Sequence, residues 1–376
     1  MTDTPASTRR LVSIVRSDAV LELRIDTVDL VACGDDEVLI RVEAAPLNPS
    51  DQAVLFAFAD LSTARQSGSD DSPVIEADIP KKAMSMLKAR VDKAMPVGNE
   101  GAGTVIAAGK NGQQLLGKTV ATMAGGMYAD YRIAKVSDCL PVADGISPRQ
   151  AASSVVNPMT ALCMTEVMRR EGHKALVHTA AASNLGQMLN RICMADGIPL
   201  VNIVRKPEQA AILRDLGATH ICNSSEASFM SDLIEAIADT GATLGFDATG
   251  GGELASHILT AMEVAQSRDM RHYSVYGSTT LKQVYQYGFL DRSPTMLHHS
   301  YGMSWGVGGF LLPNYLAKLG QQDTFKLFGR VLSELTTTFA SHYSAEVSLS
   351  GALQLDAIRD YSQQATGQKY LVVPRG

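Results

Sequence analysis

Short apolar runs alternate with segments of helical apolar spacing from residue 175 to residue 276 of this chain. The runs are typical of buried strands, and we predict strands at Ala175–His178, Leu200–Val204, Thr219–Cys222, Thr243–Asp247 and Tyr273–Tyr276. The intervening helices are predicted at Leu185–Ala195, Glu208–Leu216, Phe229–Ala238 and Glu253–Val264. This alternation predicts an α/β fold with a parallel, doubly wound sheet. Right-handed crossovers would then place the carboxyl ends of all strands, and with them a ligand, at one edge of the sheet.

The loop after the first predicted strand has the position of a dinucleotide-binding loop. Thr179–Gly186 reads T-A-A-A-S-N-L-G and leads into a helix, whose N-terminal amides can hold a pyrophosphate. Only Gly186 remains of the glycines usual in such a loop, but the side chains at the other tight positions are small. An ordinary strand-to-helix turn is the alternative. The expected cofactor contacts are Ala182, Ser183, Asn184, Leu185 and Gly186.

The second predicted strand ends in Val204-Arg205-Lys206, where an enzyme that uses NAD usually carries an acidic residue for the ribose hydroxyls. Two cations suit the 2′-phosphate of NADPH instead, because arginine offers a planar fork to phosphate oxygens and lysine adds a point charge. Arg205 and Lys206 therefore predict NADPH as the cofactor. The alternative is a solvated pair of charges at a strand end.

The first third of the chain is predicted to be mainly β. Runs such as Glu37–Val42, Gly103–Ala108 and Thr119–Ala124 have strand-like composition and are broken by polar turns. An insertion at about residues 62–95 interrupts this pattern. Within it, Arg65–Ser72 is rich in Gly, Ser and Asp and is predicted to be a loop, whereas Ile79–Met95 carries apolar residues at helical spacing and is predicted to be a helix.

Length and composition limit the class of protein. A chain of 376 residues exceeds what one hydrophobic core usually supports, so we expect two domains, with a hinge at Asn157, a good helix N-cap that Pro158 follows. The net charge of -6 provides no basic surplus for nucleic acid. We find no secretion signal and no apolar run long enough for a membrane span, and we expect a cytoplasmic protein. The five cysteines lie far apart, which argues against disulfides and structural zinc.

Five segments resemble, in order and spacing, the medium-chain dehydrogenase/reductase superfamily, specifically its quinone oxidoreductase and enoyl-thioester reductase branches. They are A-P-L-N-P-S-D at 45–51, P-V-G-N-E-G-A-G at 96–103, G-M-Y-A-D-Y at 126–131, V-N-P-M-T-A at 156–161 and D-A-T-G-G at 247–251. The likeness runs from about Val12 to Val373. It implies a GroES-like, β-rich catalytic domain at 1–156 and 314–376, and a Rossmann domain that binds NADP at 157–313.

The resemblance also bears on metal. Zinc-dependent members carry a cysteine near residues 48–51, a histidine where Asn99 stands, and a lobe of closely spaced cysteines. This chain has none of these ligands, so the resemblance implies an enzyme without zinc.

Site residues follow from the same resemblance. It implies that Asn48 lies beside the nicotinamide ribose and donates to the substrate carbonyl, and that Thr160 contacts the nicotinamide amide. Thr249 and the strand end Tyr276-Gly277 are further expected cofactor contacts. As structural alternatives, Asn48 is a turn residue before Pro49 and Thr160 is a residue in the first turn of a helix.

The proton donor stays open among Tyr128, Tyr276 and solvent, and Tyr128 is the catalytic candidate. Enoyl-thioester reductases carry a tyrosine shortly after N-P-S-D, where this chain has Phe56 and Phe58. The substrate pocket is expected along Leu47–Phe58, the 62–95 insertion and Trp305–Phe310.

The expected activity is the NADPH-dependent reduction of a quinone or an activated C=C bond, by hydride transfer without metal. The alternative is a non-catalytic homologue that binds NADPH and has a structural or sensing role. Members of the superfamily commonly pair through an edge strand of the Rossmann sheet. We therefore expect a homodimer through Val284–Leu290 and Tyr301–Leu312; otherwise these aromatic stretches line the pocket of one subunit.

Overall fold

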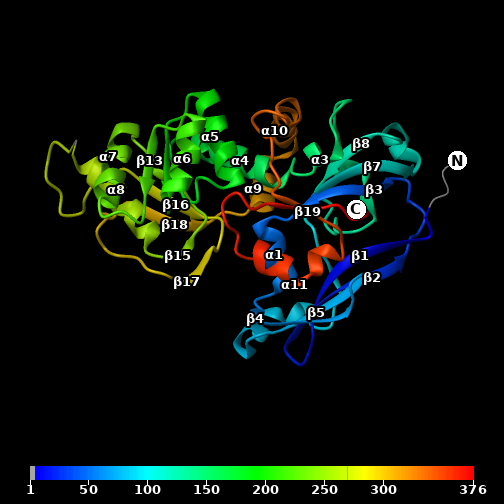
Figure 1. Ribbon diagram of the computed structural model, residues 1–376. Helices are drawn as coiled ribbons and strands as arrows, with labels where there is room; N and C mark the ends of the chain where they lie inside the picture. Colours follow the sequence, from blue (N-terminus) through cyan, green and yellow to red (C-terminus); the bar gives the residue numbers. More distant parts are fainter. Residues whose placement is uncertain (1–4, 269) are drawn as a thin grey trace. The chain divides into compact units, whose positions relative to one another are not determined.

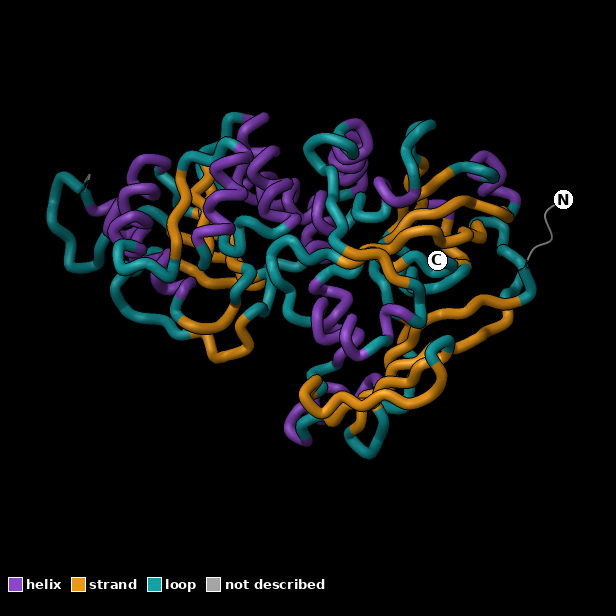
Figure 2. The backbone as a smooth tube through the Cα atoms, viewed as in Figure 1, coloured by secondary structure: helices purple, strands orange, loops and turns teal. Residues whose placement is uncertain are grey.

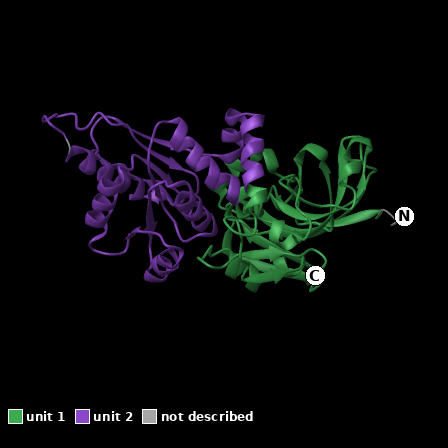
Figure 3. Cartoon of the chain, turned by 90° about the horizontal axis from the view of Figure 1, so that it is seen from above, with its two compact units in different colours: residues 1–156, 331–376 green, residues 157–330 purple. Residues whose placement is uncertain are grey.

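The computed structural model describes residues 5–268 and 270–376 and divides the chain into two compact units (Figures 1 and 3). Unit 1 comprises residues 1–156 and 331–376, and unit 2 comprises residues 157–330. The chain therefore passes from unit 1 to unit 2 at the expected hinge, Asn157. The return to unit 1 follows Arg330, whereas the sequence-based boundary followed residue 313.

Unit 1 contains two sheets. The first has the strand order β4-β5-β2-β1-β6, and all its pairs are antiparallel. In β2 the buried side chains of Leu21 and Leu23 alternate with less buried ones, as expected when one face of a sheet covers the core. The strands are β1 (Ser7–Val15), β2 (Val20–Asp29), β4 (Asp60–Ser69), β5 (Ser72–Asp78) and β6 (Met95–Pro96).

The second sheet of unit 1 has the order β10-β8-β7-β3-β20-β19, and β9 also pairs with β3. Its last two strands come from the C-terminal segment, where Leu371 pairs with Pro46 of β3. Its strands are β3 (Glu37–Pro46), β7 (Gly101–Ala108), β8 (Thr119–Thr122), β9 (Tyr131–Lys135), β10 (Cys139–Pro141), β19 (Ala345–Val347) and β20 (Tyr370–Val372). The helices of this unit are short: α1 (Pro49–Phe56), α2 (Met84–Leu87), α3 (Pro148–Ala151) and α11 (Leu355–Tyr361).

Unit 2 is a doubly wound α/β unit, which confirms the predicted fold class. Its sheet has the order β13-β12-β11-β14-β16-β18 and every pair is parallel. Helices accompany the strands along the chain, as the purple and orange segments of Figure 2 show. All five residues of β12 are buried, as expected for a strand covered on both faces.

The sheet strands of unit 2 are β11 (Leu176–His178), β12 (Leu200–Val204), β13 (His220–Asn223), β14 (Leu244–Asp247), β16 (Lys282–Gln286) and β18 (Trp305–Gly309). A small parallel pair joins β15 (Gly250–Gly252) to β17 (Asp291–Thr295). The helices are α4 (Val156–Arg170), α5 (Asn184–Asp196), α6 (Pro207–Leu216), α7 (Phe229–Thr240), α8 (Leu254–Ser267), α9 (Leu312–Leu319) and α10 (Gln321–Ser333); α4 begins in unit 1 and α10 ends there.

Two expectations for the 62–95 insertion were wrong. The polar stretch Arg65–Ser72 is not a loop but the tip of a hairpin: it comprises the second half of β4, the turn and the first residue of β5. The side chains of β4 are mostly exposed and can therefore be polar. The predicted helix at Ile79–Met95 is only a series of short helical turns between Lys81 and Arg90. Ala83 and Leu87 are buried as the spacing requires, but Asp92 adopts a φ of 56° and the chain leaves the helical path.

The prediction of the last strand of unit 2 was also wrong. Tyr273–Tyr276 is a loop, and the side chains of Tyr273 and Tyr276 are 92% and 70% exposed. The strand is Lys282–Gln286 instead, and its residues Lys282 and Val284 are fully buried. Both runs have strand-like composition, and burial between two neighbouring strands decided which of them pairs.

Candidate cofactor and active-site residues

The loop between β11 and α5 leads directly into a capped helix N-terminus. Ser183 caps α5, and its Oγ accepts a hydrogen bond from the Gly186 N–H at 3.1 Å. A Cβ at Gly186 would lie 2.1 Å from the Ala181 carbonyl oxygen, so only glycine allows the helix to approach the loop this closely. Asn184 and Leu185 open the helix, where backbone N–H groups favour an anion. The structure thus brings Ala182, Ser183, Asn184, Leu185 and Gly186 together at the carboxyl end of β11.

Arg205 and Lys206 follow β12, the strand next to β11. Their backbone is fixed, because the Gln209 side-chain oxygen accepts from both N–H groups, at 2.9 and 3.1 Å. The hydroxyl of Ser225 donates to the Arg205 carbonyl at 2.7 Å. Both cationic side chains are exposed, and within residues 5–268 and 270–376 neither has an acidic partner.

Thr249 belongs to a turn that a buried carboxylate organises. Asp247, at the end of β14, is fully buried and accepts from the backbone N–H groups of Thr249 and Gly250 at 2.8 and 3.1 Å. The Thr179 hydroxyl donates to the same carboxylate at 2.8 Å. Through Asp247, hydrogen bonds connect the D-A-T-G-G segment to Thr179, the first residue after β11. Thr249 therefore lies at the carboxyl edge of the sheet.

Tyr276 and Gly277 do not lie where the sequence placed them. They precede β16, so they are at the amino end of the strand rather than at the carboxyl edge where ligands bind such sheets. A Cβ at Gly277 would lie 2.5 Å from Oε1 of Glu263, whose carboxylate forms a buried ion pair with Lys282 at 2.6 Å. This Tyr-Gly pair is part of a structural loop, and its placement removes the reason for assigning it to the cofactor.

A second Tyr-Gly pair, Tyr287-Gly288, follows β16 and occupies the expected position. The Tyr287 hydroxyl lies 2.7 Å from Nε2 of His178, and the two rings stack at 5.7 Å between centroids. Burial lowers the pKa of His178 to about 3, so the imidazole is neutral at physiological pH. The strand-like alternation of Lys282–Gln286 was the signal that could have identified Tyr287.

Asn48 lies in unit 1, buried just before α1. Its Nδ2 donates to Oε1 of Glu100 at 2.9 Å, while its Oδ1 is buried without a hydrogen-bond partner. Glu100 is fully buried, and its Oε2 accepts from the N–H groups of Val155 and Val156 at 2.8 and 2.9 Å. Burial raises the pKa of Glu100, whereas the charge of Lys369 and these hydrogen bonds lower it.

Asp51 links the N-P-S-D segment to the N-E-G segment. One carboxylate oxygen accepts from the Asn48 N–H at 2.8 Å and the other from the Asn99 N–H at 2.7 Å. The Asn99 side chain donates to the Ser50 hydroxyl at 3.0 Å. Hydrogen bonds thus join the segments in which zinc-dependent members have ligands. No group of three or more His, Cys, Asp or Glu residues in the described chain is arranged to hold a metal ion.

Tyr128 is a core residue of unit 1. It is 1% exposed and donates to the Pro46 carbonyl at 3.0 Å. Burial raises its pKa well above the usual range, so its phenol stays neutral. This environment favours a structural role over proton donation, for which Tyr128 was one of three candidates. Thr160, in α4 of unit 2, is 7% exposed.

Sequence reasoning missed three residues that lie near Glu100 and its neighbours. The ammonium of Lys369 donates to the Ser153 hydroxyl at 2.8 Å, and the Tyr343 hydroxyl donates to the same oxygen at 3.0 Å. Burial lowers the pKa of Lys369 to about 8, although Glu100 and Asp51 raise it. No spacing could have revealed this cluster, because Lys369 and Ser153 are 216 residues apart.

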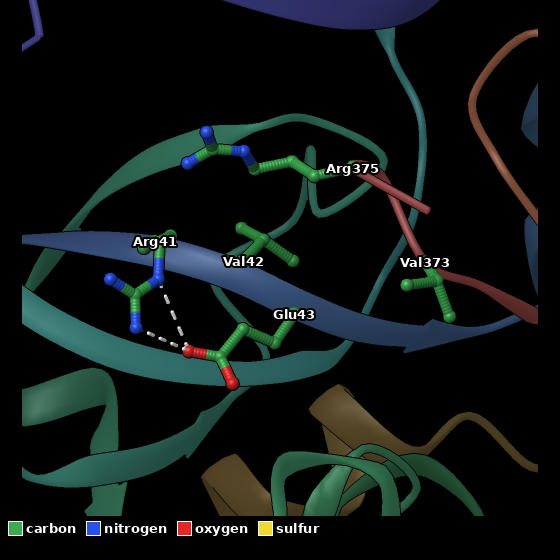
Figure 4. Close-up of a pocket in the computed structure, with 5 residues that line it drawn as sticks. All are labelled: Arg41, Val42, Glu43, Val373 and Arg375. Carbon is green, nitrogen blue, oxygen red and sulfur yellow. Dashed lines mark hydrogen bonds and ion pairs between the residues drawn. The ribbon is translucent and has the colours of Figure 1, made fainter.

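A pocket of about 470 Å³ in unit 1 lies apart from these residues (Figure 4). Arg41, Val42, Glu43, Val373 and Arg375 line it. Arg41 pairs with Glu43 at 3.0 Å, so one of the two cations that line the pocket, Arg41 and Arg375, already has an acidic partner. The pocket contains none of the expected site residues.

No protein-family model matches the chain. Over 224 residues it is 26% identical to the mitochondrial enoyl-[acyl-carrier-protein] reductase of Xenopus tropicalis. That match covers 58% of this chain and 57% of the relative, so the chain aligns with little more than half the length of the curated relative. In the described chain, no helix combines the length and apolarity that a membrane crossing requires.

Solved structures match nearly the whole chain. A Mesorhizobium loti protein assigned to the NADPH:quinone reductases has a TM-score of 0.73 and 24% identity, and the match covers 99% of this chain and all of that one. Quinone oxidoreductase of Escherichia coli, in complex with NADPH, has a TM-score of 0.69 and 16% identity over 98% of this chain and all of that one. The chain thus shares the fold of these quinone reductase structures and is similar in sequence to an enoyl-[acyl-carrier-protein] reductase over little more than half its length.

Proposed function

We propose that the chain is an NADPH-dependent oxidoreductase that reduces a quinone or an activated C=C bond by hydride transfer. The observation that carries this proposal is the exposed Arg205–Lys206 pair, two cations without acidic partners in the described chain, at the carboxyl end of β12. The neighbouring strand leads into the amide-rich N-terminus of α5. A 2′-phosphate and a pyrophosphate are the groups that these two features recognise.

Further features of the chain fit the nucleotide. The tight turn at Gly186 and the small side chains before it suit a phosphate at the α5 N-terminus. By resemblance, the nicotinamide end reaches Asn48 and Thr160. Bound NADPH would supply the hydride, and these residues would bind and orient the nucleotide. The enoyl reductase and quinone reductase names of the similar proteins support an activated alkene or a quinone as substrate.

The deciding experiment is NADPH oxidation, followed at 340 nm, with a panel of quinones, enones and enoyl thioesters. Turnover of at least one class, faster with NADPH than with NADH, is expected. Tight NADPH binding without turnover of any panel member would instead favour the non-catalytic homologue, and absence of NADPH binding would reject both.

The proposal includes catalysis without zinc, because Ser50, Asp51 and Asn99 bond to one another where zinc-dependent members have ligands. Treatment with a chelator should leave both the activity and the melting temperature unchanged. Metal analysis of the pure protein is the check, and one equivalent of zinc per chain would contradict this part.

The proposal also includes a cytoplasmic homodimer. β18 is an edge strand of the unit 2 sheet, and unpaired strand edges are commonly covered by a partner.

A further inference from the structure

Two buried asparagines join α5 to β12 within unit 2. Asn190 of α5 and Asn202 of β12 are 2% and 1% exposed. The Nδ2 of Asn190 donates to Oδ1 of Asn202 at 2.8 Å, and the Nδ2 of Asn202 donates back to Oδ1 of Asn190 at 3.1 Å. The two side chains thus form a cyclic amide pair between a helix and a strand.

The remaining N–H of each amide also has an acceptor. Asn190 donates to the Gly186 carbonyl, one turn earlier in α5, at 2.9 Å. Asn202 donates to the His220 carbonyl at the start of β13, at 3.3 Å. Rotating either amide by 180° would turn its oxygen toward a carbonyl oxygen, so these acceptors fix the orientation of the pair. Every side-chain N–H of the pair is therefore used.

Close packing restrains α5 less on one side of this pair. A cavity of about 190 Å³ lies at the amino ends of β12 and β13, and Cys193 and Met194 of α5 line it together with the two asparagines. Side chains that face a cavity lose packing contacts on that side. The directional hydrogen bonds of the amides therefore restrain the second half of α5 along β12 where packing is incomplete.

The chemistry of the pair favours a role in position over a role in stability. Replacing both members of a buried hydrogen-bonded pair by apolar groups of the same shape can be nearly neutral for stability, because burial costs the amides their hydrogen bonds to water. Apolar surfaces can slide along one another, whereas a fully satisfied polar network selects one arrangement. The amide pair therefore indicates a defined register of α5 on β12.

Both elements that the pair joins lead to expected phosphate contacts. Gly186, which accepts from Asn190, belongs to the first turn of α5, and the strand of Asn202 leads into Arg205 and Lys206. We propose that Asn190 and Asn202 are positioning residues that set the spacing between the α5 N-terminus and this pair of cations. One NADPH molecule can then reach both, with its pyrophosphate and its 2′-phosphate. The inference rests on the proposed function.

A double substitution separates position from stability. The variant that combines Asn190→Leu with Asn202→Leu replaces both amides by apolar groups of similar shape, so its melting temperature should stay close to that of the wild type. The ratio of the NADH to the NADPH dissociation constant should nevertheless fall by about 3- to 10-fold, because the 2′-phosphate contact is weakened rather than removed. Fluorescence titration measures both constants. A merely structural pair would leave this ratio unchanged.

A fragment of the nucleotide distinguishes altered spacing from damage to the cations. 2′-AMP carries the 2′-phosphate without the pyrophosphate, so it requires Arg205 and Lys206 but not their distance from α5. Linked groups bind together only when their separation matches that of their sites. Calorimetric titration should therefore give the same affinity for 2′-AMP in the wild type and in the double leucine variant.

Two further variants complete the experiment. Met194→Leu changes the same cavity at nearly constant side-chain volume and keeps the amide pair, so it should retain the wild-type ratio. Asn190→Ala combined with Asn202→Ala removes the amides without overpacking, in case the leucine variant does not fold. It should melt at a lower temperature, because it enlarges the cavity, and its ratio should fall as well.

The outcomes separate this inference from the proposed function. An unchanged ratio in the folded double variants would overturn the inference and leave the proposed function intact, as would an equal fall in Met194→Leu. Weaker binding of 2′-AMP would show that the cations themselves were displaced, and equal weakening of NADPH and NADH would limit the pair to supporting α5; either result overturns the proposed spacing role. A wild type that does not bind NADPH would reject the proposed function, and the inference with it.

Discussion

Asp51 is completely buried and accepts two backbone hydrogen bonds. Burial favours its protonated form and the hydrogen bonds favour its ionised form, and the difference between the two effects decides how the stability of the protein depends on pH. Burial raises its pKa to about 7, although the N–H groups of Asn48 and Asn99 lower it. The folded state therefore holds the proton more tightly than the unfolded chain, whose ordinary Asp value is near 3.8. By linkage, the stability that this group contributes is complete below about pH 4 and is lost as the pH rises through about 7.

We expect Asp51→Asn to flatten the fall in the free energy of unfolding between pH 4.5 and 7.5. Urea denaturation at several pH values measures this slope for the wild type and the variant. Asp356→Asn is the control, because the Asp356 side chain is 97% exposed. Parallel curves for the wild type and Asp51→Asn would show that Asp51 titrates normally.

Arg205 and Lys206 determine the predicted preference for NADPH. Replacing both by alanine removes charge-assisted contacts of about 1.5–3 kcal/mol, which corresponds to roughly 10- to 150-fold weaker NADPH binding. Binding of NADH, which has no 2′-phosphate, should change far less. Arg214→Ala removes a cation from the other end of α6 and serves as the control. Equal wild-type affinities for the two nucleotides would refute the preference.

At the scale of elements, the close approach of α5 to the loop before it depends on Gly186, which has no side chain. Because a Cβ at Gly186 would meet the Ala181 backbone at 2.1 Å, Gly186→Ala must displace the helix or the loop. We expect a loss of about 1–3 kcal/mol in stability, as for overpacked sites, and weaker NADPH binding.

Gly329→Ala is the matched control, since a Cβ there has nothing within 4 Å in α10. This substitution should be neutral or stabilising by up to about 1 kcal/mol, the helix propensity difference. Thermal melts and nucleotide titration of both variants provide the comparison. Equal behaviour of the two would mean that the loop accommodates a methyl group without cost.

At the scale of the whole molecule, the prediction concerns the free edge of β18. The Phe310 N–H bonds to Gln286, so by alternation the backbone N–H of Gly309 points away from β16. A Cβ at Gly309 would meet nothing within 4 Å, so Gly309→Pro removes an outward donor without a clash at Cβ.

Light scattering at micromolar concentration should give about twice the 40.1 kDa of one chain for the wild type, and a shift toward one chain for Gly309→Pro. A wild-type mass near that of one chain would refute the homodimer. A stable dimer of the proline variant would move the interface to another surface.

Local patterns of the sequence determined the parallel α/β unit, the β-rich first third and the strand-to-helix loop at 179–186, because hydrophobic periodicity and turn chemistry depend on neighbours within a few residues. They also led to the prediction of Arg205 and Lys206 as cofactor contacts, since the end of a strand and the charge that follows it are adjacent in the chain. The hairpin β4–β5 was not predicted, because the mostly exposed strand β4 has no apolar pattern.

Only the tertiary structure decided between Tyr276-Gly277 and Tyr287-Gly288, because burial between two other strands selects the run that pairs. Packing likewise placed Tyr128 in the core and brought Glu100 to the amide of Asn48, at a separation of 52 residues. The orientation of that amide depends on which acceptors surround it, and those surroundings exist only once distant segments of the chain have come together.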